Sequence, residues 1–217
     1  MTGFFSRLFG NQAAPTLTRG PLGLHKQAGF TLETLMFRLC EDQLQISIPG
    51  EMYTVSACGT FDLGAGSAIH RYYTSGDEFL QISTTGGQES ENIDDIKLFV
   101  YQDSSGISGA KAWQDTLSSL GDRQIRWQNA TWQRVFNAEE AGRIAPIHAI
   151  ENVVNTEGEC WDVHNFMMAY QRQVSEELFE YLLLTGEETF NDDDEPEWLF
   201  SRALGVDIPL TSIKVVG

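Results

Sequence analysis

Apolar and polar residues alternate along much of the first half of the chain, with the period of two that is typical of β-strands. Leu44, Ile46 and Ile48 alternate with polar neighbours, and residues 96–101 repeat the period. Turn-forming residues separate such segments at hairpin spacing, at Pro49–Gly50, Gly64–Ser67, Ser75–Asp77 and Thr85–Gln88. Parallel pairing would need crossover helices for which the sequence leaves no room, so residues 30–105 predict an antiparallel sheet or barrel.

The clearest helix is predicted for residues 109–120. Ser108 is suited to its N-cap, and Gly121 is suited to the position that ends it. One apolar stripe runs along this segment, formed by Ala110, Trp113, Leu117 and Leu120. The spacing therefore favours a short amphipathic helix.

A β-hairpin is predicted directly after this helix, over residues 124–136. In one straight strand Trp127 and Trp132 would face opposite sides. A two-residue turn at Asn129–Ala130 instead places both indoles on one face.

The last third of the chain predicts further strands. Residues 148–154 form one strand, and residues 166–174 and 178–185 form a hairpin that turns near Ser175–Glu176, with a helix from Glu176 as the alternative. A short helix is predicted to begin at Glu195–Pro196 and to run through Leu204, and a final strand or turn is predicted within residues 208–216.

These elements predict an α+β fold that is mainly antiparallel β, as a sheet or a barrel, with two or three short helices. We expect an N-terminal head and loop over residues 1–27 and one globular domain over residues 28–217, with a subdivision near residues 105–122 as an alternative. The chain has 217 residues, of which 41% are hydrophobic, enough for a core without disulfides or metals. Because the sequence shows neither a transmembrane segment nor a secretory signal, we expect a cytoplasmic protein with three reduced cysteines.

Charge is distributed unevenly along the chain. The formal net charge is -17, yet residues 1–32 contain Arg7, Arg19 and Lys26 and no acid. Seven acids fall within residues 187–197, which predicts a solvated acidic loop that binds a basic partner. We expect its contact residues to be Glu187, Glu188, Asp192, Asp193, Asp194 and Glu195. A surface of this charge argues against nucleic acid as a partner.

The head also carries an apolar face. Phe4, Phe5, Leu8 and Phe9 have the spacing of one side of a short helix. Such a helix is marginal alone in water, so this face is expected to lie on the protein's own core, on a partner, or weakly on a membrane surface.

A small-molecule or metal-binding enzyme is the alternative function. Its site would lie near Trp127, Trp132, Cys58, Cys160 and His164. Cys160, Asp162 and His164 would share one strand face, and His148 would supply a fourth metal ligand. Ordinary buried cysteines and an edge histidine explain the same residues, so we assign no metal, no cofactor and no catalytic residue.

Four strings resemble the YjfK-like family of uncharacterised enterobacterial proteins: the head MTGFFSRLFG, the hairpin WQNATWQRVF, the segment GECWDVHNFMMAYQR and the terminal LGVDIPLTSIKVVG. The resemblance covers essentially the whole chain and implies a domain of unknown function, without catalytic residues to carry over. It also implies a gene neighbourhood with a membrane-stress protein of the phage-shock type, small membrane proteins and an ATP-grasp ligase. We therefore expect a non-enzymatic interaction adaptor with a basic or membrane-associated protein partner, linked to membrane stress.

Overall fold

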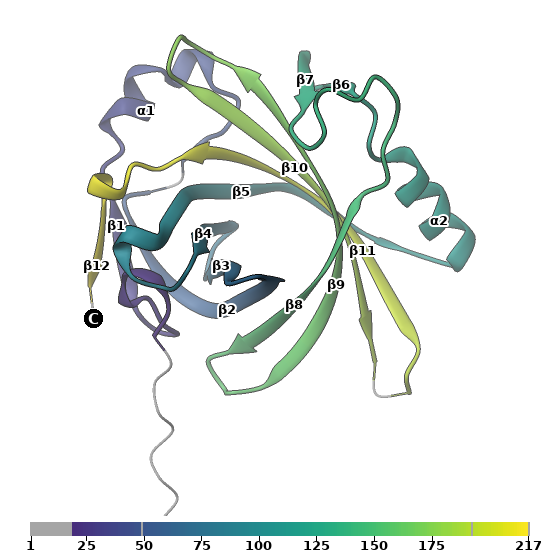
Figure 1. Ribbon diagram of the computed structural model, residues 1–217, viewed down its shortest axis with the longest axis horizontal. Helices are drawn as coiled ribbons and strands as arrows, with labels where there is room; N and C mark the ends of the chain where they lie inside the picture. The colour runs from purple at the N-terminus through teal and green to yellow at the C-terminus, as the bar shows by residue number, and fades with distance from the viewer. Residues whose placement is uncertain (1–18, 49, 192, 217) are drawn as a thin grey trace, which may run out of the picture.

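The computed structural model describes residues 19–48, 50–191 and 193–216. This part of the chain is dominated by twelve strands that form one antiparallel sheet, together with two short helices (Figure 1). The strands are β1 (Gly29–Leu32), β2 (Met52–Gly64), β3 (Ser67–Thr74), β4 (Glu78–Thr85), β5 (Ile93–Ile107), β6 (Gln124–Trp127), β7 (Ala130–Arg134), β8 (Ile147–Asn155), β9 (Cys160–Gln173), β10 (Phe179–Phe190), β11 (Pro196–Asp207) and β12 (Ile213–Val216). The helices are α1 (Leu35–Leu39) and α2 (Ala110–Ser119). The prediction of a mainly antiparallel β protein is confirmed.

Eight of the strands close into a barrel. Following the pairings, the ring runs β2, β3, β4, β5, β11, β10, β9 and β8. β8 closes it because it pairs with both β2 and β9. The free half of β2 carries β1 and then β12, whereas the far half of β9 carries the β6–β7 hairpin. Of the two alternatives that the sequence predicts, an open sheet or a barrel, the structure has a closed barrel.

Two apolar clusters lie on opposite faces of the barrel strands. The smaller one fills the interior and contains Phe61, Phe79 and Phe99. The larger one lies outside the barrel wall, beneath the segments that wrap it, to which Leu24, Phe30, Ile46, Trp132 and Ile213 belong. Long strands such as β10 and β11 are thus buried on both faces.

Helix α2 lies against the outside of β10, where Trp113 packs on Gly186 (Figure 1). A Cβ on Gly186 would come within 2.7 Å of the Trp113 ring, so this close approach needs glycine. The helix and its ending before Gly121, where φ is +95°, agree with the sequence prediction. An ion pair between Lys111 and Asp115 lies on its exposed face. The N-cap is Gly109 rather than Ser108.

The predicted hairpins also form. Trp127 and Trp132 lie on one face with ring centroids 6.3 Å apart, although the turn is at Gln128–Asn129, one residue earlier than predicted. The β9–β10 hairpin turns between residues 173 and 179, as predicted, and β8 and β12 match the other predicted strands.

Two predicted elements are wrong. Residues 44–48 are not a strand, because the backbone N–H groups of Gln45 and Ile46 donate to the Glu180 carboxylate, at 2.8 and 2.5 Å, instead of to a neighbouring strand. Residues 196–204 are not a helix but most of β11, which pairs on one side with β5 and on the other with β10.

The expected head lies mostly outside the described residues, and with it Phe4, Phe5, Leu8 and Phe9. Its described end, residues 19–27, includes Leu24, which is fully buried in the larger cluster. Among the described residues, no helix is both long enough and apolar enough to cross a membrane.

Candidate functional site

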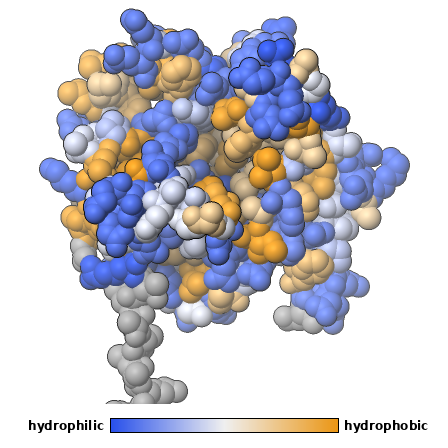
Figure 2. Space-filling model, viewed as in Figure 1, coloured by the Kyte–Doolittle hydropathy of each residue, from blue (hydrophilic) through white to orange (hydrophobic). Residues whose placement is uncertain are grey.

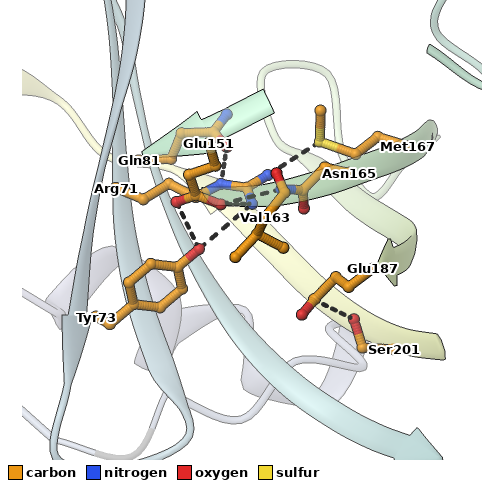
Figure 3. Close-up of polar contacts among 9 residues, drawn as sticks. All are labelled: Arg71, Tyr73, Gln81, Glu151, Val163, Asn165, Met167, Glu187 and Ser201. Atoms are coloured by element: carbon orange, nitrogen blue, oxygen red, sulfur yellow. Dashed lines mark hydrogen bonds and ion pairs between the residues drawn. The ribbon is translucent and has the colours of Figure 1, made fainter. Parts of the chain in front are cut away.

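Charged residues occupy the middle of the barrel interior (Figure 3). Arg71 on β3 donates from Nη1 to Oε2 of Glu151 on β8, at 3.4 Å. The Tyr73 hydroxyl donates to Oε1 of the same carboxylate, at 2.8 Å. Gly59 on β2 leaves room for this carboxylate, because a Cβ there would lie 1.7 Å from Oε1.

The remaining contacts of Arg71 join further strands. Its Nε donates to Gln81 on β4 at 3.1 Å, and Nη2 contacts the Met167 sulfur on β9 at 3.2 Å. The guanidinium also lies over the rings of Phe61 and Phe79, 4.7 and 5.1 Å from their centroids. Because these partners all belong to the barrel, the arrangement is typical of a structural ion pair rather than of a ligand-binding arginine.

Two further polar residues border this pair. Asn165 donates to Glu151 Oε2 at 3.3 Å, while its own Oδ1 is buried without a partner among the described residues. Burial raises the pKa of Glu187, the attraction of Arg71 opposes that rise, and repulsion from Glu151 adds to it. Glu187 therefore retains its proton to a higher pH than an exposed glutamate.

A second site is a groove beside α1, which we call the α1 groove. It is a cavity of about 450 Å³ between α1, the start of β5, the β9–β10 turn and the 3-10 turn Leu210–Ser212. Its walls are largely apolar, and six of the residues that form them are Met36, Phe37, Ile93, Ile96, Leu178 and Leu210.

Helix α1 extends this apolar surface into solvent. Phe37 anchors the helix, with 7% of its surface exposed, whereas Leu35, Met36 and Leu39 are 58%, 68% and 74% exposed. Figure 2 shows apolar side chains at the surface where α1 lies in Figure 1. Contiguous exposed apolar side chains next to a cavity are typical of interaction sites.

The rim of the α1 groove is acidic. Five carboxylates line it, those of Glu33, Asp94, Asp95, Glu177 and Asp207, and no lysine or arginine of the described chain does. Lys97 neutralises part of this charge by pairing with Asp95 and Asp207, at 2.6 and 2.7 Å. Glu33, Asp94 and Glu177 form no ion pair with the described residues, so the groove combines an apolar floor with net negative charge.

The predicted acidic contact residues do not form one loop. Glu187 and Glu188 belong to β10, where Glu187 faces the barrel interior and Glu188 accepts a hydrogen bond from the Trp198 indole at 2.7 Å. β10 pairs with β11 up to Phe190 and Pro196, so the connecting loop is shorter than the predicted acidic loop of residues 187–197. Asp193, Asp194 and Glu195 are exposed in the turn that follows, and Asp192 lies outside the described residues.

The residues of the predicted small-molecule pocket lie near opposite ends of β9. Trp127 and Trp132 belong to the hairpin that pairs with Tyr170 and Gln171, whereas Cys58 lies across β8 from Cys160, and His164 is four residues after Cys160. His164 and His148 do meet there, with Nδ1 and Nε2 3.2 Å apart. Within the described chain, no three His, Cys, Asp or Glu side chains are placed to hold a metal ion.

Arg134 on β7 is almost fully buried, and its guanidinium donates to backbone carbonyls. The acceptors are those of Gly121, Phe136, Asn137, Glu140 and Gly142. It fixes the loop that follows the β6–β7 hairpin.

No sequence pattern assigned a role to Arg71, Glu151 or the α1 groove. Arg71 is the single residue of formal charge in β3, and Glu151 is the single one in β8, which is a usable signal because charged residues are rarely buried unless they are paired. No comparable signal exists for the groove, because its walls come from four distant segments of the chain.

The fold and these sites define a closed antiparallel β-barrel that is covered by short segments. A buried ion pair lies in its interior, and an acidic groove lies on its outside. The chain belongs to the family described as "Protein of unknown function (DUF2491)", whose model matches residues 4–214. It is 59% identical over 219 residues to "Uncharacterized protein YjfK" of Escherichia coli (strain K12), with all of both chains covered. No solved structure matches it.

Proposed function

We propose that this protein is an interaction adaptor whose α1 groove binds a partner segment that carries apolar side chains flanked by lysine or arginine. The observation that carries the proposal is the combination of exposed Leu35, Met36 and Leu39 with an acidic rim. Apolar anchors in a groove supply most of the affinity of such complexes, and complementary charge supplies specificity and association rate.

The volume of the groove supports an anchor of a few side chains. About 450 Å³ is within the range of sites that enclose a compact apolar group. Five carboxylates around this space disfavour an acidic segment and favour a basic one. The basic or membrane-associated partner expected from the sequence fits this chemistry, and the link to membrane stress remains part of the proposal through the family resemblance.

The acidic turn is a second contact within the same proposal. Asp193, Asp194 and Glu195 are exposed there beside one exposed apolar residue, Phe190, whereas α1 presents three exposed apolar side chains next to a cavity. We therefore assign the turn a smaller share of the affinity than the groove.

A peptide-display selection on the full chain tests the proposal. We expect enriched sequences to combine apolar residues with Lys or Arg, and to lose binding to Met36→Glu. Met52→Glu is the matched control, because Met52 is 74% exposed and lies outside the groove. An enriched set that is acidic, or that binds Met36→Glu as well as the wild type, would contradict the proposal.

A companion variant separates the groove from the turn. Replacing Asp193, Asp194 and Glu195 by Asn, Asn and Gln removes three charges without touching an apolar anchor. We expect a smaller loss of affinity than for Met36→Glu. A larger loss would place the main contact at the acidic turn.

A further inference from the structure

A second cavity, which we call the His70 cavity, lies outside the barrel wall. It measures about 580 Å³ and lies between residues 19–27 and the outer faces of β2, β3 and β8. Its size is that of a small-molecule site. It shares no lining residue with the α1 groove.

The charge of this cavity is opposite to that of the protein. Arg19, His25 and Lys26 line it, and no carboxylate of the described chain does. Neither Arg19 nor Lys26 forms an ion pair with the described residues, and residues 1–32 contain no acid. In a chain with a net charge of -17, two unpaired cations at one cavity favour an anionic ligand.

His70 supplies independent evidence for a missing partner. It is only 6% exposed, lines the cavity, and its Nε2 has no hydrogen-bond partner among the described residues. A buried polar atom without a partner is destabilising, and native proteins rarely leave one. Burial also lowers the pKa of His70, so the ring is neutral at physiological pH and one nitrogen carries a proton that it can donate.

The remaining wall combines neutral donors with apolar surface. Burial raises the pKa of Cys58 to about 11 and also raises that of Tyr72, so both side chains stay protonated. Leu24 and Val154 add apolar contacts. One part of the cavity therefore suits an oxyanion and another part suits an apolar body.

We propose that the His70 cavity binds a small organic anion, with its phosphate or carboxylate group between Arg19 and Lys26 and a hydrogen bond to His70. This site is independent of the α1 groove, because the two have no residue in common. The protein would then have two separate sites, the α1 groove for a partner protein and the His70 cavity for a small anion.

Calorimetric titration of the full chain with three probes tests this site. Phenyl phosphate and benzoate share an aromatic body and differ in the oxyanion, and benzyl alcohol has the body without the charge. We expect at least one of the two anionic probes to bind saturably and benzyl alcohol not to bind. The anion that binds more tightly indicates whether the natural ligand carries a phosphate or a carboxylate. Absence of saturable binding by both anions, or equal binding of benzyl alcohol, would overturn the proposal.

Variants locate the binding. Arg19→Gln and Lys26→Gln are each expected to lower the affinity for the anionic probe about tenfold, which is the usual effect of losing a charge-assisted hydrogen bond. Lys214→Gln is the matched control, since it removes the same charge from an exposed position on β12 and is expected to bind as the wild type does. If Lys214→Gln lowered the affinity for the probe by the same factor, the effect would come from the net charge of the protein and not from the cavity, and the proposal would be overturned.

His70→Phe tests the hydrogen bond itself. It keeps a ring of similar size and removes both nitrogens, so we expect weaker probe binding in a folded protein. Unchanged affinity would overturn the role of His70. Should this variant fail to fold, the two surface variants still decide the site.

Discussion

Arg71 and Glu151 form an ion pair inside the barrel, with 3.4 Å between Nη1 and Oε2 and only 3% and 2% of the side chains exposed. Their strands, β3 and β8, are not neighbours in the sheet, since β2 lies between them. The pair therefore spans the interior across β2. Gly59 on β2 provides the space that the Glu151 carboxylate occupies.

Breaking this pair from one side leaves a buried charge without its counterpart. Arg71→Met is expected to lower the free energy of unfolding by about 3–5 kcal/mol, because the Glu151 carboxylate then lies uncompensated in the barrel. Urea denaturation monitored by tryptophan fluorescence measures the change. The double variant Arg71→Met with Glu151→Leu is expected to recover part of the loss, because both charges are gone. A loss below about 1 kcal/mol in the single variant would show that water reaches the carboxylate.

Gly59 is expected to tolerate no side chain. A Cβ would lie 1.7 Å from Glu151 Oε1, so Gly59→Ala must displace the carboxylate and is expected to lower the unfolding free energy by about 1–3 kcal/mol. Gly106→Ala is the matched control, because Gly106 also lies in a strand and has no atom within 4 Å of its would-be Cβ. Equal effects in the two variants, by thermal or urea unfolding, would argue against the close contact at Gly59.

The raised pKa of Glu187 predicts a pH dependence of stability. Above the usual value of 4.5, the folded protein keeps a proton on Glu187 that the unfolded chain has lost. The free energy of unfolding therefore falls as the pH rises through the window between 4.5 and the raised value. Glu187→Gln removes the ionisable group, and with it this fall in the free energy of unfolding. We therefore expect the variant to be more stable than the wild type at pH 7 and to lose that advantage below pH 4.5. Urea unfolding curves at both pH values measure it, and a difference that does not change with pH would contradict the shift.

Local sequence patterns predicted the elements whose backbone hydrogen bonds are local. Helix α2 and the β6–β7 hairpin follow from an apolar stripe and from a turn between two tryptophans. The β9–β10 hairpin follows from two apolar segments with a short polar connection. In each, the backbone hydrogen bonds join neighbouring parts of the chain, although the apolar stripe of α2 packs on Gly186 of a distant strand.

The wrong predictions concern segments whose partners are distant in sequence. Residues 44–48 have the alternation of a strand, but Glu180, 135 residues after Gln45, takes their backbone hydrogen bonds. Strand β11 looks helical because it is buried on both faces, with Ala203 in the interior cluster and Leu204 in the outer one, so alternation is lost. The α1 groove could not be predicted for the same reason, since its walls come together only in the folded barrel.

A binding titration with variants measures whether a basic, apolar peptide occupies the α1 groove. A fluorescent peptide from the display selection is titrated against the wild type, Met36→Glu and Met52→Glu, at low and high salt. We expect Met36→Glu to weaken peptide binding at least about tenfold, Met52→Glu to leave it unchanged, and high salt to weaken binding to the wild type. Equal affinity of all three proteins, or binding that salt leaves unchanged, would contradict an acidic groove beside α1 as the partner site.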